Sequence, residues 1–205
     1  MFRTLRPVLV SIALLLFIPA LKAQVNVSAS GGTTFAAYAT LKAAFDGVNA
    51  GTHQGTIEII ITGNTTEAAT ATLNASGMGS ASYVSVFIGP GIGVNAVVSG
   101  NINNGPVVKL NGSNNVTING SNNFSTTRNL TITNTSTVSA NVLQIGSAGT
   151  TAIHDVIVKN TIIVNGSHTS TAILVGDAAV GGNPGHFSYI TFQNNSIRKA
   201  YIGIY

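Results

Sequence analysis

The sequence holds few side chains that could carry acid–base chemistry, and these are scattered along its 205 residues. The carboxylates are Asp46, Glu58, Glu67, Asp155 and Asp177, and the histidines are His53, His154, His168 and His186. Glycoside hydrolysis needs two carboxylates at one bond, and calcium loops need closely spaced acidic residues, but neither Asp-Asp nor Asp-x-Asp occurs. The histidines lack zinc-binding spacing, and the chain has no Cys. The sequence therefore predicts no catalytic residue, no metal site and no cofactor.

One His-Asp pair stands next to an apolar stretch. His154 and Asp155 directly precede Val156, which begins an expected strand. A carboxylate beside an imidazole can form half of an acid–base site. The alternative is a polar corner ahead of the strand, and we favour the corner.

Three tyrosines lie near the end of the sequence and could contact sugars. Tyr189, Tyr201 and Tyr205 fall within 17 residues of one another, and exposed aromatic rings suit carbohydrate faces. A tyrosine beside a strand more often packs against a loop, so Tyr189 and Tyr201 are candidates for carbohydrate contact and no more.

The first 23 residues predict a secretory signal peptide. Arg3 and Arg6 precede an apolar run over residues 8–18, and Pro19 and the small residue Ala23 follow it. This order of basic, apolar and small residues is typical of a cleaved signal. This run of eleven residues, one of which is Ser11, is too short for a membrane span, which needs about 20. We expect a secreted mature chain that begins at Gln24 and has no transmembrane span.

Most of the net charge belongs to this segment. The whole chain carries a formal charge of +4, whereas residues 24–205 hold six basic and five acidic residues, a charge of +1. Nucleic-acid binding needs a clustered basic face, so the sequence excludes that class of partner. Only 7% of the residues are charged, against about 25% in an average domain, and Asn, Ser and Thr take their place.

One helix is expected, over residues 40–49. Leu41, Ala44, Phe45 and Val48 have the i, i+3, i+4, i+7 spacing of an apolar stripe. Thr40 is a suitable N-cap residue, and Gly51 suits the stop. We expect this helix to lie in a cap segment, residues 24–56.

Short β-branched strands bounded by Gly, Asn or Ser are expected in the rest of the chain. They cover residues 57–61, 84–88, 96–98, 107–110, 116–118, 130–132, 142–145, 156–158, 162–164, 173–175, 190–192 and 202–204. Two patterns recur in fixed order. The pattern apolar-x-apolar-x-Asn begins at residues 130, 156 and 190, and an apolar pattern that mostly ends in Gly covers residues 142–146, 173–176 and 202–204.

Such a repeat predicts a parallel β-helix, an all-β solenoid in which each coil has two or three short strands. Successive coils stack at about 4.8 Å, so equivalent residues lie above one another. We expect Asn134, Asn160 and Asn194 to form a hydrogen-bonded ladder at one corner. Coils are expected over residues 57–205, with the N-terminal helix covering the apolar end. Because the sequence stops within a repeat strand, we expect a solenoid that is incomplete at its C-terminal end.

The sequence resembles the pectin-lyase-like superfamily of right-handed parallel β-helices. The resemblance covers residues 34–205 and depends on the cap segment beginning at Thr40, with Gly63 and Glu67 after the first strand, and on coil sequences at residues 115–120 and 129–134. The mature chain also resembles the N-terminal region of large secreted surface proteins of Gram-negative bacteria. This resemblance implies a fold, but many functions share that fold.

The same resemblance extends weakly to one group of enzymes. Gly185-His186 and Arg198-Lys199 are similar to the Gly-His-Gly and Arg-x-Lys elements of polygalacturonases. Here Phe187 follows the histidine, the basic residues are adjacent and the acidic partners are missing. We therefore keep His186 only as a candidate for carbohydrate contact.

These features predict a secreted or cell-surface, non-catalytic segment that acts as a structural spacer or adhesin-like region, with corner loops such as residues 178–188 presented outward. The expected partners are extracellular carbohydrate or a host or cell surface. The alternative is the N-terminal part of a carbohydrate-active enzyme, a lyase or a hydrolase, whose catalytic coils lie beyond residue 205. A sugar-binding module that uses the tyrosines is a third alternative.

Overall fold

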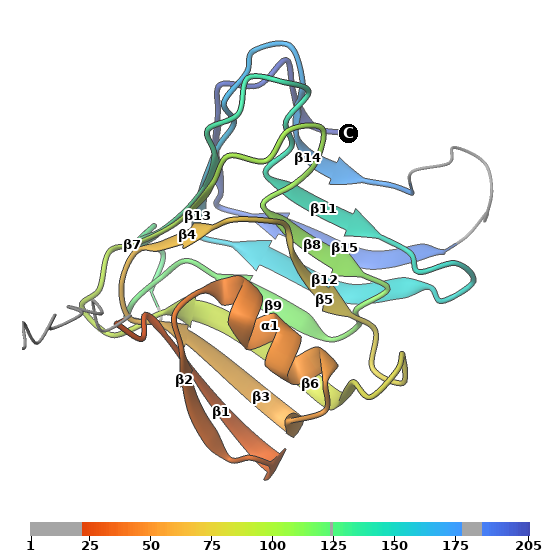
Figure 1. Cartoon of the computed structure of the whole chain (residues 1–205). Coiled ribbons are helices and arrows are strands. Elements are labelled where there is room, and N and C mark those ends of the chain that lie inside the picture. Colours follow the sequence, from red (N-terminus) through yellow and green to blue (C-terminus); the bar gives the residue numbers. More distant parts are fainter. Residues whose placement is uncertain (1–21, 124, 178–185) are drawn as a thin grey trace, which may run out of the picture.

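The computed structural model describes residues 22–123, 125–177 and 186–205, and nearly all of the expected signal peptide lies outside these residues. The described chain is a parallel β-solenoid of about four turns with one short helix (Figure 1). Its parallel strands form three sets, which we call sheets A, B and C. Sheet A holds β3 (His53–Ile61), β6 (Ser82–Pro90), β9 (Val116–Asn119), β12 (Ile153–Lys159) and β15 (Phe187–Gln193).

The other two sheets have the same number of parallel strands. Sheet B holds β4 (Thr65–Glu67), β7 (Ala96–Gly100), β10 (Leu130–Asn134), β13 (Thr161–Val164) and β16 (Ser196–Arg198). Sheet C holds β5 (Ala71–Asn74), β8 (Val108–Asn111), β11 (Leu143–Gly146), β14 (Thr171–Val175) and β17 (Ile202–Ile204). One strand from each sheet forms a rung, and the rungs follow one another in chain order. The expected fold class is confirmed, with three strands in every rung.

Alternating side chains explain why the rungs stack. Each strand directs every second residue into a narrow interior, as β3 does with Ile57, Ile59 and Ile61, all of which are buried. The same interior position recurs from rung to rung in sheet A, at Ile57, Val86, Val116, Val156 and Ile190. Burying one such side chain contributes about 1.5–3 kcal/mol, and a one-residue slip of a strand would turn its apolar set outward.

The helix α1 (Leu41–Asn49) closes the apolar interior at the N-terminal end. The four residues of its predicted stripe are all buried, and Thr40 is the N-cap, with its Oγ1 accepting from Ala43 N at 3.1 Å. Gly51 follows the helix with φ +73°, a conformation that glycine adopts without strain. The helix lies chiefly against β5 of sheet C, as Figure 1 shows. The predicted cap helix is confirmed.

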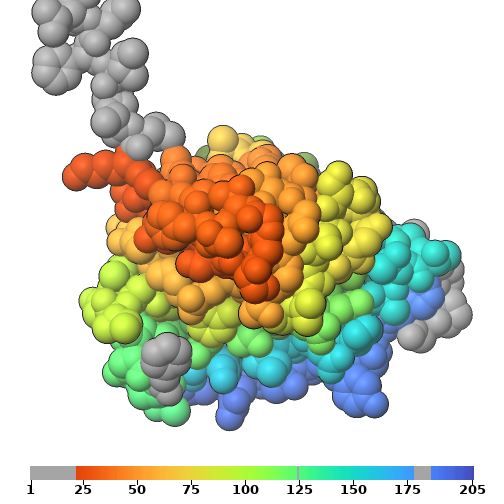
Figure 2. Space-filling model, turned by 90° about the horizontal axis from the view of Figure 1, so that it is seen from below, coloured from red at the N-terminus to blue at the C-terminus, as the bar shows by residue number. Residues whose placement is uncertain are grey.

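Two further strands, which sequence reasoning missed, cover the hydrogen-bonding edge of β3. The strand β1 (Val25–Gly32) pairs antiparallel with β3, and β2 (Phe35–Tyr38) pairs antiparallel with β1. The N-terminal cap therefore has two parts, because the helix covers the interior while the two strands satisfy the edge. In Figure 2 the red and orange residues form a continuous surface over this end of the stack. No described helix is long and apolar enough to cross a membrane.

The repeat alignment predicted from sequence is wrong in one of its three members. Leu130 pairs with Thr161 in sheet B, whereas Val156 pairs with Val116 and Ile190 in sheet A. The apolar-x-apolar-x-Asn pattern misleads because strands of sheet A and of sheet B both alternate apolar and polar residues, and an asparagine stands at the corner that follows each. The pattern therefore does not distinguish the two sheets. The second predicted set does lie in one sheet, sheet C. There Leu143 pairs with Ile173, as the alternation implies. The strand β17 is displaced by two residues from the predicted alignment, because Ile173 pairs with Ile204 and not with Ile202.

A buried carboxylate joins the cap helix to the first rung. Glu67 of β4 is 2% exposed, and its two carboxylate oxygens accept from Leu41 N at 3.0 Å and Lys42 N at 2.9 Å. These two amides belong to the first turn of α1, where helix amides have no partner within the helix and where negative charge is favourable. Glu67 thus complements the Thr40 cap.

We expect Glu67→Ala to lower the free energy of unfolding by about 1–3 kcal/mol, because it leaves buried amides without acceptors. Urea unfolding followed by circular dichroism measures this. The matched control is Glu58→Ala, since Glu58 also belongs to the first rung, in β3, but is exposed, and its change should stay within about 0.5 kcal/mol. Equal losses for the two variants would contradict the assigned role of Glu67.

Candidate functional site

An asparagine ladder runs along the corner that follows sheet A. Asn160 Nδ2 donates to Asn119 Oδ1 at 2.8 Å, and Asn194 Nδ2 donates to Asn160 Oδ1 at 2.7 Å. Asn160 and Asn194 have φ of 55° and 50°, a left-handed conformation that asparagine tolerates better than most residues. Two of the three predicted ladder residues, Asn160 and Asn194, therefore do stack. The third member of the ladder is Asn119, which sequence reasoning missed.

Asn134 does not belong to this ladder, and its predicted place there is a misassignment. It ends β10 in sheet B and is fully buried, and the two hydrogens of its Nδ2 are shared among the carbonyl oxygens of Ile102, Gly105 and Asn141, which lie 2.8–3.0 Å from Nδ2. Its Oδ1 accepts from Ile102 N. Asn134 therefore holds the corner between sheets B and C by satisfying loop backbone groups, with no stacked asparagine involved.

The predicted carbohydrate-contact residues lie on separate elements. Tyr189 is on β15 of sheet A and is 79% exposed, whereas Tyr201 lies between β16 and β17 and is 78% exposed. His186 immediately precedes β15, and its Nδ1 is buried with no hydrogen-bond partner among the described residues. Among all the residues that the structure describes, the one aromatic ring pair is Tyr38 with His53, which lies at the other end of the stack. The structure therefore places these three residues in the last rung without joining them into a platform.

Tyr189 has an unusual backbone, and its neighbours in the stack explain it. Its φ is 52°, and the residues before Val116 and Val156, which are Asn115 and Asp155, have φ of 56° and 55°. The chain therefore makes the same left-handed step at three successive levels of sheet A, directly before β9 and within β12 and β15. Asn and Asp tolerate this step, whereas a bulky side chain is strained there.

Asp155 also forms a surface pair with His154. His154 Nδ1 lies 2.6 Å from Asp155 Oδ2, and the two side chains are about half exposed. The backbone amide of His154 is held by Asn114 Oδ1 at 2.8 Å. This pair lies at the left-handed step of β12, so it forms a polar irregularity within the strand. Among the described residues, no third His, Cys, Asp or Glu joins it in a cluster that could hold a metal ion.

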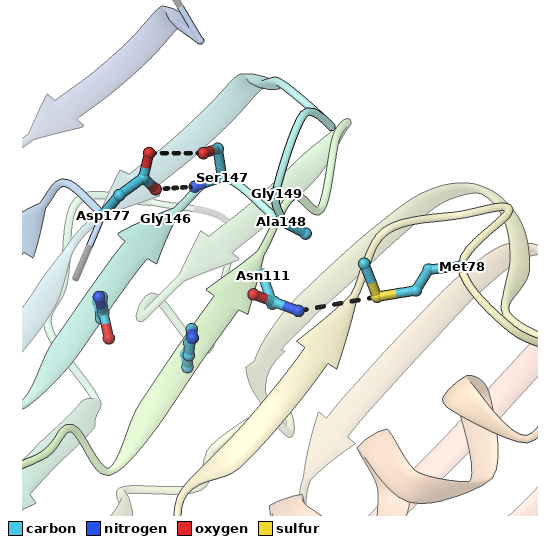
Figure 3. Close-up of a pocket in the computed structure, with 9 residues that line it drawn as sticks. Met78, Asn111, Gly146, Ser147, Ala148, Gly149 and Asp177 are labelled. Carbon is cyan, nitrogen blue, oxygen red and sulfur yellow. Dashed lines mark hydrogen bonds between the residues drawn. The ribbon is translucent and has the colours of Figure 1, made fainter. Parts of the chain in front are cut away.

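A polar groove on the outer face of sheet C is the most developed candidate site (Figure 3). It has a volume of about 480 Å³, and its floor is formed by residues of β8 and β11, with loops on either side. The groove is lined by Met78, Lys109, Asn111, Gln144, Gly146, Ser147, Ala148, Gly149 and Asp177. Sequence reasoning missed it, because the groove depends on which outward side chains the rungs align and on how the corner loops fold beside them.

The two sides of the groove are fixed by hydrogen bonds. On one side Asp177 accepts from Ser147 N at 2.7 Å and from Ser147 Oγ at 2.6 Å, and on the other Asn111 Nδ2 donates to Met78 Sδ at 3.7 Å (Figure 3). Asn111 Nδ2 also donates to Asn74 Oδ1. The carboxylate of Asp177 is therefore engaged in holding a loop, which leaves it poorly suited to act as a free base.

Tyr83 is linked to the groove through Asn74, which accepts a hydrogen bond from Asn111. Its hydroxyl donates to Asn74 O at 2.6 Å, which ties β6 to the last residue of β5. Burial raises the pKa of Tyr83 to about 12, since removal from water disfavours the phenolate. Tyr83 is thus a neutral donor at any physiological pH and acts as a structural residue.

The groove offers binding groups rather than reacting groups. Lys109 forms no ion pair within the described part of the chain, where the ion pairs are Lys42–Asp46 and His154–Asp155. Gln144 also lines the groove; its Nε2 donates to Gly176 O at 3.2 Å, and its Oε1 is an acceptor. An ammonium and amide groups side by side, next to the apolar Met78, suit a ligand rich in hydroxyl groups.

Comparisons with protein-family models, curated proteins and solved structures found no match to this chain. The pectin-lyase-like resemblance therefore stays a prediction from sequence motifs.

We expect Tyr189→Asn to raise the free energy of unfolding by about 0.5–1 kcal/mol, because asparagine relieves the left-handed strain. The control is Tyr201→Asn, since Tyr201 is equally exposed but has no positive φ. Thermal unfolding of the two variants beside the parent chain measures the difference. A loss of stability in Tyr189→Asn that exceeds the loss in Tyr201→Asn would show that the tyrosine ring contributes packing that outweighs the strain.

Proposed function

We propose that this chain is a non-catalytic β-helix segment of a secreted or cell-surface protein, where it serves as a rigid spacer with an adhesin-like contact surface. The observation that carries the proposal is the use of its polar side chains. The ladder of Asn119, Asn160 and Asn194 and the corner residue Asn134 commit their amides to holding rungs and loops in place. Fully satisfied polar networks of this kind make a fold rigid.

The groove on sheet C supports the adhesin-like part of the proposal. Lys109, Asn111 and Gln144 come from two neighbouring rungs, so their spacing is set by strand pairing and not by a mobile loop. Binding groups on a rigid scaffold lose little entropy on association. An extracellular carbohydrate, which offers hydroxyl groups to amides and oxygens to an ammonium, is the partner that this chemistry favours.

The alternative is the N-terminal part of a carbohydrate-active enzyme. The observation in its favour is the 2.6 Å contact between His154 and Asp155, in which a carboxylate orients an imidazole as in many acid–base sites. The pair is not among the residues that line the groove, so a ligand held by Lys109 would not be held against it. The groove therefore favours binding over turnover.

A retention and product assay tests the proposal. The purified chain is passed over insoluble neutral and acidic polysaccharides, and the eluate is analysed for new reducing ends and unsaturated sugars. We expect retention without products. The double variant Lys109→Ala/Gln144→Ala should bind about tenfold more weakly, because each lost hydrogen bond costs about 0.5–1.5 kcal/mol.

The matched control is Lys159→Ala, because Lys159 lies on sheet A, away from the groove, and its loss should leave retention unchanged. Product formation that disappears in His154→Ala would contradict the non-catalytic proposal and favour the enzyme. Retention on none of the polysaccharides would contradict the adhesin-like part.

A further inference from the structure

A second pocket, largely apolar, lies on the outer face of sheet A near the N-terminal end. It has a volume of about 340 Å³ and lies over β3 and β6 and the turn that follows β6. The pocket is lined by Glu58, Ile60, Phe87, Pro90, Gly91, Ile92, Ser121 and Asn122. It shares no lining residue with the groove on sheet C, and the proposed function does not use it.

The floor of this pocket exists because one position has no side chain. Gly89 pairs with Ile60 of the neighbouring strand. A Cβ on Gly89 would lie 3.0 Å from Phe87 Cε1 and 2.8 Å from Asn119 O. The Phe87 ring therefore leans over Gly89, and the space beside Ile60 stays open.

The walls of the pocket are held by hydrogen bonds between two corner loops. Asn122 Nδ2 donates to Val94 O at 3.0 Å, and Asn129 Nδ2 donates to Asn95 Oδ1 at 2.6 Å. The wall that carries Pro90, Gly91 and Ile92 is thereby tied to the wall that carries Ser121. Ile92 is 84% exposed at the rim, where its side chain is available for contact. The pocket is thus preformed, as small-molecule and side-chain sites are.

The pocket carries one negative charge, and no ion pair among the described residues neutralises it. Glu58 pairs in register with Phe87 across β3 and β6, and it is the one ionisable residue among those that line the pocket. It forms no ion pair within the described part of the chain. A carboxylate beside an aromatic face and aliphatic walls complements a cation on an apolar stem.

We propose that this pocket binds the side chain of a lysine presented by a partner protein. The four-carbon stem of lysine would lie against Ile60 and Ile92, and its ammonium would reach Glu58 and the face of Phe87. The site is distinct from the polar groove, so the chain would contact carbohydrate and protein on different sheets.

Titration with short capped peptides tests the proposal. Ala-Lys-Ala and Ala-norleucine-Ala are added to the purified chain, and amide shifts of the pocket residues are followed by NMR. We expect saturable shifts with the lysine peptide and at least about tenfold weaker binding of the norleucine peptide, which lacks the ammonium. Added salt should weaken the lysine complex.

Two variants make the test specific. Glu58→Gln should weaken the lysine peptide about tenfold and leave the norleucine peptide unchanged, and Ile92→Ser should weaken both peptides. Asp155→Asn is the control, because Asp155 is an exposed carboxylate outside the pocket. Equal binding of the two peptides, an effect of Asp155→Asn as large as that of Glu58→Gln, or no shift with either peptide would overturn the proposal.

Discussion

The in-register stacking of apolar side chains inside a narrow, three-sided interior is the interaction on which the rest of the structure depends. Ile57, Val86, Val116 and Val156 lie above one another in sheet A because every strand alternates with the same phase. This phase decides which residues face outward, since a one-residue slip exchanges the two faces of a strand. Lys109 and Gln144 in the groove, and Glu58 and Phe87 in the pocket, are neighbours only because the interior fixes the register.

The corners between the sheets give the molecule surface features that the regular interior lacks. At the corner after sheet A, asparagines with positive φ turn the chain and bond to one another, while at the corner after sheet B, Asn134 bonds to loop carbonyls instead. Loop length varies freely at such corners because insertions do not disturb the stack. Concave surface features therefore arise beside the loops, as both the groove and the pocket do.

Much of the fold could be predicted from sequence, because alternation and helical periodicity are local signals. The stripe of Leu41 and Phe45 and most of the strands followed from them. Sequence reasoning did not predict the edge strands β1 and β2 or the short strands β4, β5 and β16. Each has only three to eight residues, many of them small or polar, so its alternation is a weak signal. Asn134 was misassigned because strands of two sheets share one motif. Glu67, the groove and the pocket were missed, because they depend on residues brought together from different rungs.

Disulfide trapping tests the stacking register most directly, because the chain has no Cys of its own. Thr131 and Ile162 pair across sheet B, and neighbouring strands lie about 4.8 Å apart, within the about 4.4–6.8 Å between Cα atoms that a disulfide needs. The account predicts that Thr131→Cys/Ile162→Cys forms an intramolecular disulfide on mild oxidation. It also predicts that Thr131→Cys/Ile157→Cys does not, since Ile157 lies in sheet A. Crosslinking of the second pair instead of the first would contradict the three-sheet register from which both proposed binding surfaces are derived.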